Sequence, residues 1–226
     1  MRRLLHRLPY REHGYIGQLY YLFLIIIKIS LVIALGEALY KENWLAAFMA
    51  ILAFALTYLP DYFKKSYNIK LPLLFEFCTV VFVYASLFMG EILNYYSLFW
   101  WWDLVLHGAS ALGFGIAGFL ILYVLYQGKK LEARPGTIAV FAFCFALAIG
   151  AVWEIFEFGM DQLFGFHMQK SGLLDTMSDL IVDALGALIA SLSGYAYLKA
   201  KESIIFGKVM LWFRTENKHL FSQKKR

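Results

Sequence analysis

The sequence has little of what marks the common classes of soluble protein. Of its 226 residues, only two are cysteines and four are prolines, and 16% are charged. Cys78 and Cys144 both fall inside hydrophobic segments, so a disulfide framework and a cysteine-type zinc site are excluded. The chain also lacks a polar linker, a low-complexity stretch, a nucleophile motif, a nucleotide-binding loop and a haem signature. We therefore expect a single domain, and no reaction class stands out from these features.

Hydrophobic residues are what the chain has in excess. They make up 61% of the sequence, aromatic residues make up 19%, and the mean hydropathy is +0.62. Such a composition is typical of integral membrane proteins and not of soluble domains. No small-residue cleavage site follows the first apolar segment, so we expect that segment to insert without being cleaved. Six stretches are long enough to span a bilayer: residues 17–36, 43–59, 71–90, 103–126, 137–158 and 174–198.

The basic residues are distributed unevenly among the loops. Of the 21 lysines and arginines, 18 lie before the first predicted span, after the last one, or in the second and fourth loops, whereas the alternate loops hold only Lys41 and Lys170. Basic residues concentrate on the cytoplasmic side of membrane proteins. The predicted fold class is therefore an all-α polytopic membrane protein in the bacterial cytoplasmic (inner) membrane, with six transmembrane helices over residues 1–202 and both termini cytoplasmic. The net charge of +5 reflects this topology, so we predict no nucleic-acid partner.

The predicted cytoplasmic tail, residues 203–226, has an amphipathic pattern. Its apolar residues alternate at helical spacing with basic ones, which is typical of a helix lying on the anionic inner leaflet. A tail that docks a protein partner is the alternative. Membrane lipids are the partners we predict, and the sequence specifies neither a soluble partner nor an oligomeric state. The apolar residues are Ile205, Val209, Trp212 and Phe213, and the basic ones include Lys208, Arg214 and Lys218.

Three of the predicted spans carry acidic residues at the same, extracytoplasmic end. Ionised carboxylates near lipid cost roughly 2.5–3.5 kcal/mol each at mid-membrane, so these groups indicate a polar site. Within each helix the spacing places them on one face. The same face continues as a stripe of small residues such as Gly115, Gly150 and Gly186, which allows helices to approach closely. We expect the stripes to face one another and the following residues to converge: Asp103, His107, Glu154, Glu157, Asp161, Asp175, Asp179 and Asp183.

Clustered carboxylates repel one another unless a cation, bound protons or water compensates their charge. Carboxylates with one imidazole suit a divalent ion such as Mg²⁺, Mn²⁺, Ca²⁺, Zn²⁺ or iron, and the spacing does not select one of them. Asp103, Asp161 and Asp175 lie at helix ends, where a solvated position at the interface is equally compatible, and Asp103 and Asp175 suit N-terminal capping positions. His107 and Glu157 are the candidate acid/base residues. The candidate metal ligands are Asp103, His107, Glu154, Asp175, Asp179 and Asp183.

Other polar residues surround this predicted site. The loop between the fifth and sixth spans contains Gln169 and Lys170 and is either a lid, a substrate contact or a solvated connection. Glu91, at the outer end of the third span, is expected at the rim. Deeper in the membrane, Lys28 and Glu76 are expected to form a buried ion pair, unless Lys28 extends to the interface.

The motifs around these residues resemble those of the YjdF-like family of bacterial inner-membrane proteins, over residues 60–186. More distantly, the order of Asp, His, Glu and Asp resembles VanZ-like proteins, which are associated with glycopeptide-antibiotic tolerance, although the basic residues of VanZ-like motifs are not evident. The YjdF-like resemblance implies a fold and a set of site residues but no reaction. The motifs are Trp102–Asp103–x3–His107–x2–Ser110, Trp153–Glu154–x2–Glu157–x3–Asp161 and Gln169–x–Ser171–Gly172–x2–Asp175–Thr176–x2–Asp179.

Three functions are consistent with the sequence. The first is a metal-dependent enzyme acting at the outer leaflet on a lipid or lipid-linked envelope substrate. The second is a transporter for a divalent cation or protons, since acids in membrane helices are usual in such pathways. The third is a non-catalytic ion-binding or scaffold protein of the envelope. The acids stop halfway along their helices, which favours the first and third functions over transport.

Overall fold

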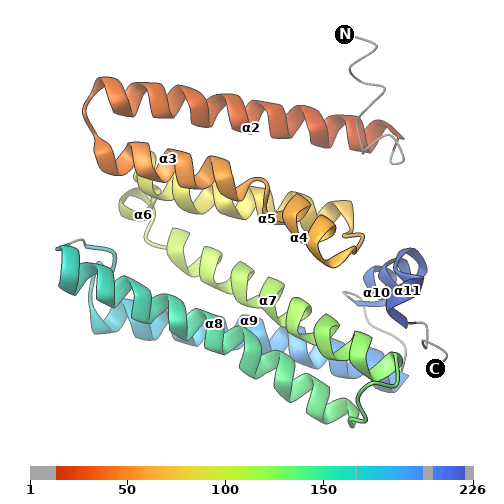
Figure 1. The fold of residues 1–226 in the computed structure, drawn as a ribbon. Helices are drawn as coiled ribbons and strands as arrows, with labels where there is room; N and C mark the ends of the chain where they lie inside the picture. Colours follow the sequence, from red (N-terminus) through yellow and green to blue (C-terminus); the bar gives the residue numbers. More distant parts are fainter. Residues whose placement is uncertain (1–13, 166, 201–205, 222–226) are drawn as a thin grey trace. The chain divides into compact units, whose positions relative to one another are not determined.

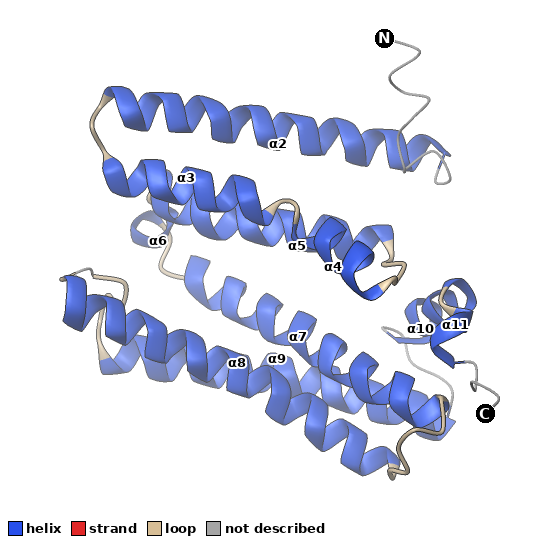
Figure 2. Ribbon diagram, viewed as in Figure 1, coloured by secondary structure: helices blue, strands red, loops and turns tan. Residues whose placement is uncertain are grey.

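A computed structural model of the chain describes residues 14–165, 167–200 and 206–221. These residues form helices joined by short loops, and none of them is in a strand (Figure 2). The chain divides into two compact units, Met1–Phe99 and Trp100–Arg226, which are described separately below. The arginines at positions 2, 3, 7 and 11 and the apolar residue at position 205, on which the topology and tail predictions partly rest, lie outside the described residues.

The first unit is built around the long helix α2, Gly14–Tyr40. Tyr20, Leu24, Ile27 and Leu31 of α2 lie three or four residues apart on one buried face and pack against neighbouring helices. A stretch of π-helix begins where α5 ends, within the third predicted span. The remaining elements of this unit are α3 (Trp44–Leu56), α4 (Leu59–Tyr67), α5 (Leu73–Val83), the π-helix η2 (Tyr84–Ile92) and α6 (Tyr95–Leu98) (Figure 1).

The predicted Lys28–Glu76 ion pair is wrong. The Nζ of Lys28 lies 3.6 Å from the centre of the Tyr58 ring, an arrangement typical of a cation–π interaction. Glu76 is buried, and its Oε2 is paired with Lys64 Nζ at 2.9 Å. Lys64 reaches Glu76 from the short helix α4, which follows the second predicted span and was not itself predicted.

The second unit consists of three long helices that lie side by side, α7 (Trp102–Gln127), α8 (Pro135–Phe164) and α9 (Leu173–Ala200) (Figure 1). Small residues line their contacts, as expected from the sequence. A Cβ added to Gly186 of α9 would lie 3.0 Å from the Cβ of Ala111 in α7, and one added to Gly115 of α7 would lie 2.5 Å from the Cβ of Ala190 in α9. Gly150 of α8 lies against Asp183 of α9 in the same way. The prediction that the small-residue stripes face one another is thus confirmed.

At the far end of this unit from the acidic residues, the helices enclose an apolar cluster. Phe119 and Tyr123 of α7 form a buried cluster there with Ile138 and Ala142 of α8. The helix α10 (Phe206–Glu216) and the short α11 (Lys218–Phe221) complete this end. Met210 of α10 belongs to the same cluster, and Phe213 is also buried, so part of the predicted lipid-facing side contacts protein. The location of this tail on the inner leaflet stays a prediction.

Five segments among the described residues are long and apolar enough to cross a membrane: Gly14–Tyr40, Trp44–Tyr67, Leu73–Ile92, Trp102–Gln127 and Pro135–Phe164. Many of their large apolar side chains are exposed, for example Ile33 at 64% and Ile155 at 68%, as lipid-facing residues would be. The sixth predicted span coincides with α9, which has 28 residues but is not one of these five. The count of six and the cytoplasmic position of both termini therefore stay predictions.

Candidate functional site

The acidic residues of the second unit lie where α7 begins, α8 ends and α9 begins. Asp103 is in the first turn of α7 and Asp175 in the first turn of α9, where a negative charge interacts favourably with the helix dipole. Glu154 and Glu157 lie on the buried face of α8, and Asp179 and Asp183 on the buried face of α9. Each set falls on one face because the residues are three or four positions apart.

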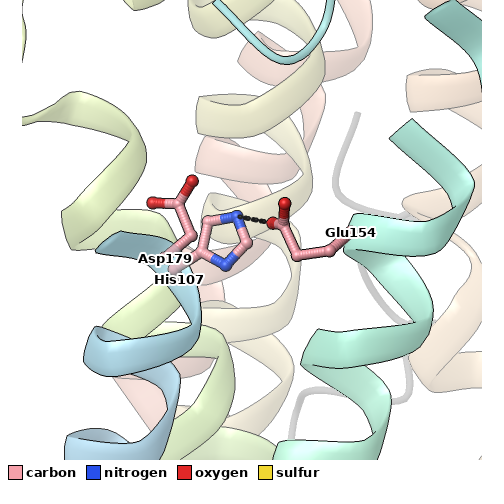
Figure 3. Close-up of side chains that lie close together, drawn as sticks. All are labelled: His107, Glu154 and Asp179. Carbon is pink, nitrogen blue, oxygen red and sulfur yellow. Dashed lines mark ion pairs between the residues drawn. The ribbon is translucent and has the colours of Figure 1, made fainter. Parts of the chain in front are cut away.

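His107 of α7 is at the centre of this arrangement and is 7% exposed. Its Nε2 lies 3.6 Å from Glu154 Oε1 and 3.8 Å from Asp103 Oδ1. Its Nδ1 lies 3.2 Å from Asp183 Oδ2, within hydrogen-bond distance. The two ring nitrogens therefore have different neighbours: Nδ1 lies beside the buried Asp183 carboxylate, and Nε2 lies beside Asp103 and Glu154. Figure 3 shows the ion pair with Glu154.

The side chains form two overlapping groups that suit a cation. In the first group, one ligand atom each from His107, Glu154 and Asp179 lie within 4.8 Å of one another, and all three residues are buried. In the second, Asp103, Asp175 and Asp179 meet the same criterion, and the first two are partly exposed. Asp179 belongs to both groups. We call them the inner group (His107, Glu154, Asp179) and the outer group (Asp103, Asp175, Asp179).

The inner group contains a polar atom without a hydrogen-bond partner among the described residues. Glu154 is 4% exposed. Its Oε1 faces His107 Nε2, is buried and accepts no hydrogen bond. A buried acceptor without a partner costs about 1–3 kcal/mol, and more when it is charged. One imidazole nitrogen with carboxylate oxygens is a donor set that suits Mg²⁺, Mn²⁺, Zn²⁺ or iron, and a cation between these atoms would compensate Glu154 Oε1.

Asp183 belongs to neither group, although the sequence pattern made it a candidate ligand. It is completely buried, and its Oδ2 faces His107 Nδ1. Gly150 of α8 provides the space for it, since a Cβ at position 150 would lie 2.8 Å from the Asp183 carboxyl carbon and would overlap Oδ2. A carboxylate on the second nitrogen of a histidine holds the ring in one orientation and one tautomer, as in many metal sites. The geometry therefore suits Asp183 to positioning His107.

Glu157, one of the two candidate acid/base residues, lies one turn beyond Glu154 in α8. It is 8% exposed, and its Oε1 accepts a hydrogen bond of 2.9 Å from the indole Nε1–H of Trp153. Trp153 is four residues earlier in the same helix, so its ring can cover the carboxylate. Sequence reasoning gave no role to Trp153, although its i, i+4 spacing from Glu157 was the available signal.

The loop between α8 and α9 is attached to the acidic end by side chains. Asp161 accepts hydrogen bonds from the backbone N–H groups of Met168 (2.7 Å) and Gln169 (2.9 Å). The Gln169 amide in turn donates to the Thr176 hydroxyl at 2.6 Å. Asp161, Gln169 and Thr176, which were candidate site residues, thus fix the loop and belong to neither cation group.

Lys170 of this loop reaches the outer group. Its backbone N–H donates to Asp175 Oδ2 at 3.0 Å, and its Nζ lies 3.5 Å from Asp103 Oδ2. The sequence placed Lys170 near the site but did not show which acids it contacts.

Two further candidates lie outside the cation groups. The Ser110 hydroxyl donates to the backbone carbonyl of His107 at 2.9 Å, a local contact within α7. Glu91 is in η2 of the first unit, and its role at the rim of the site stays a prediction.

Five helical segments among the described residues are able to cross a membrane, and together with the buried His/Glu/Asp group they define a multi-pass membrane protein with a candidate cation site. The chain belongs to the family described as predicted membrane protein (DUF2238), whose profile matches residues 19–200. The YjdF-like resemblance is consistent with this assignment, and the VanZ-like resemblance is not shown by it.

The family description names no activity. An uncharacterized protein from Thermotoga maritima is 35% identical over 109 residues, which cover 46% of this chain and 53% of that protein, so the match spans about half of that relative. No solved structure matches the chain.

Proposed function

We propose that this protein binds a divalent cation through the inner group and uses it in a reaction on a lipid or lipid-linked substrate of the cell envelope. The observation that carries the proposal is the buried Glu154 Oε1, which has no hydrogen-bond partner among the described residues and faces His107 Nε2. A buried carboxylate oxygen that has no hydrogen bond and lies beside an imidazole nitrogen and a second carboxylate is costly unless a positive charge, from protonated His107 or from a bound cation, compensates it. It is the arrangement expected of a metal site.

The residues around the ion divide into distinct roles in this proposal. His107, Glu154 and Asp179 supply the ligand atoms. Asp183 accepts a hydrogen bond from the Nδ1–H of His107, so the unprotonated Nε2 is available as a ligand. Since both nitrogens of His107 are then occupied, Glu157 is the better candidate for the acid/base group. A divalent ion held here would polarise a phosphoryl or carbonyl oxygen, or activate water.

The orientation in the membrane decides which substrates reach the site. We propose six spans with both termini cytoplasmic and with the acidic end of α7, α8 and α9 on the extracytoplasmic side. Within the second unit, Lys129, Lys130 and Arg134 lie in the loop between α7 and α8, at the opposite end from the acids, which supports this orientation. A helix rises about 1.5 Å per residue, so His107 and Asp179 lie only about 6 Å deeper than Asp103 and Asp175 in the first turns of α7 and α9. Such a shallow site suits a substrate whose head group is at the interface.

The distribution of charged residues along α7, α8 and α9 distinguishes catalysis from ion transport. Beyond Asp183, the residues that face one another are Gly115, Ala190, Gly194 and Phe119, and charged side chains are absent from this stretch of the three helices. A path for ions through the unit would need polar groups along its length. The hydroxyls of Ser191, Tyr123 and Tyr197 are polar groups in this part of the unit, but none of them carries a charge, and this favours cation binding with catalysis over transport.

The first test is the metal content of the protein purified in detergent. We expect bound Mg²⁺, Mn²⁺, Zn²⁺ or iron in the wild type and little in the double variant His107→Ala/Asp179→Ala. Glu132→Gln, in the loop between α7 and α8, is the matched control and should retain the metal. If the wild type binds none of these ions at micromolar free concentration, the proposal is wrong.

The catalytic half needs its own assay. Purified protein in vesicles of bacterial lipid extract should release phosphate or fatty acid when the metal is supplied, and Glu157→Gln should bind metal but release neither. Equal product from the wild type and Glu157→Gln would reject Glu157 as the acid/base group. A metal-loaded wild type that releases no product would leave cation binding in place and remove the proposed reaction on these lipids.

A further inference from the structure

The outer group is more accessible than the inner group and shares a residue with it. Asp103 and Asp175 are partly exposed at the starts of α7 and α9, whereas Asp179 is 2% exposed. Within the described part of the chain, the Asp179 carboxylate forms no hydrogen bond or ion pair. Its oxygen atoms nevertheless lie close enough to the other members of both groups to share a cation with them. A buried carboxylate that faces two sets of potential ligands is placed as a bridge between two positions.

A positive charge from the protein already lies at the outer group. Lys170 Nζ is 3.5 Å from Asp103 Oδ2, and the backbone N–H of the same residue is 3.0 Å from Asp175 Oδ2. Lys170 therefore contacts two of the three outer carboxylates. No such contact from the loop is found at the inner group in the described residues, where Glu154 Oε1 lacks a hydrogen bond.

We propose that the acidic end of α7, α8 and α9 holds two divalent cations bridged by Asp179, and that Lys170 compensates the outer position when the second ion is absent. This proposal rests on the proposed function, because the inner ion shares Asp179. Centres with two ions about 3.5–4 Å apart are typical of enzymes that transfer or hydrolyse phosphate esters. The substrate class that fits is therefore a phosphate ester at the membrane interface. Lys170, once displaced by the second ion, is close enough to contact such a phosphate.

The number of bound ions tests the proposal directly. Detergent-purified protein titrated with Mn²⁺ should bind two ions per chain, and Asp175→Asn, which alters only the outer group, should bind one. The electron paramagnetic resonance spectrum should show spin-coupled Mn²⁺ in the wild type and the hyperfine pattern of isolated Mn²⁺ in Asp175→Asn. The inner and outer positions are thereby distinguished by a signal that a general loss of folding would not produce.

Lys170 is tested by removing its charge. Lys170→Met should tighten binding of the second Mn²⁺ by about fivefold or more, because a competing unit charge 3.5 Å from Asp103 Oδ2 is removed. Binding of the first ion should change little. Lys129→Met, in the loop between α7 and α8, is the matched control and should affect neither ion. Unchanged or weaker binding of the second ion in Lys170→Met would contradict the role given to this lysine.

The outcomes separate this proposal from the proposed function. One ion per chain in the wild type, with no spin coupling at saturating Mn²⁺, would reject the two-ion centre and leave the inner site in place. No bound ion at all would reject both. Two ions in both the wild type and Asp175→Asn would place the second ion elsewhere and overturn the assignment of the outer group.

Discussion

Gly150→Ala should weaken metal binding although residue 150 contacts no proposed ligand atom. Gly150 lies in α8 opposite Asp183, and an added methyl group would lie 2.8 Å from the carboxyl carbon of Asp183 and overlap its Oδ2. The added methyl group would displace Asp183 Oδ2, which is the atom that faces His107 Nδ1. The imidazole would then lose the partner that fixes its orientation.

The magnitude follows from two separate effects. Loss of a carboxylate that orients a metal-bound histidine typically costs 10–100-fold in metal affinity, or about 1.4–2.7 kcal/mol of binding free energy. Adding a methyl group to a close-packed interior costs about 1–3 kcal/mol of folding free energy. We therefore expect the Gly150→Ala variant to fold with a lower melting temperature and to bind metal at least about tenfold more weakly than the wild type.

The assay is a metal titration followed by melting temperature or calorimetry, with Gly159→Ala as the matched control. Gly159 is in the same helix, and no atom lies within 4 Å of the Cβ it would gain. This control should bind metal as the wild type does and be equally stable or more so, by up to about 1 kcal/mol. Wild-type affinity in Gly150→Ala, or equal weakening in both variants, would refute the positioning role of Asp183.

Three further predictions concern the same unit. A reporter fused after the C-terminal residue 226 should be active in the cytoplasm and one inserted at Gly165 outside, and the reverse result would place the acidic end on the cytoplasmic face. Chelator should lower the melting temperature, and added Mn²⁺ should restore it. At a Mn²⁺ concentration a hundred times the dissociation constant, the free energy of unfolding should rise by about 2.7 kcal/mol. Asp179→Asn should reduce this response, and Glu132→Gln should not. Asp161→Ala should speed hydrogen exchange at the amides of Met168 and Gln169, because it removes the acceptor of both N–H groups; unchanged exchange would show that Asp161 does not fix the loop.

The helices and the convergence of the acidic residues could be predicted because both follow from helical periodicity. Small residues every four positions in α7, α8 and α9 indicated which faces approach closely, and the acids continue those faces. Once the faces meet, His107, Glu154 and Asp179 have to lie near one another. Their spacing along each helix sets their depth, and the shared face sets their direction.

Contacts that depend on loops or on short helices could not be predicted in this way. Asp161 binds backbone N–H groups seven and eight residues further along the chain, which requires the loop conformation after Gly165. Lys64 reaches Glu76 because residues 59–67 form the separate helix α4. The sequence showed that Lys28 and Glu76 were both charged residues inside spans, but not which direction each side chain faces around its helix axis.

The different roles of Asp179 and Asp183 originate in the helix that faces them. Both lie on the same face of α9, four residues apart, and nothing in α9 alone distinguishes them. On α8, Gly150 lies against Asp183, whereas Glu154, one turn further on, is grouped with Asp179. Asp183, opposite Gly150, has its Oδ2 beside the neighbouring imidazole, whereas Asp179 is grouped with Glu154, and two carboxylates this close require a compensating positive charge. Pairing small and acidic residues across antiparallel helices is therefore what separates a positioning carboxylate from a metal ligand in this fold.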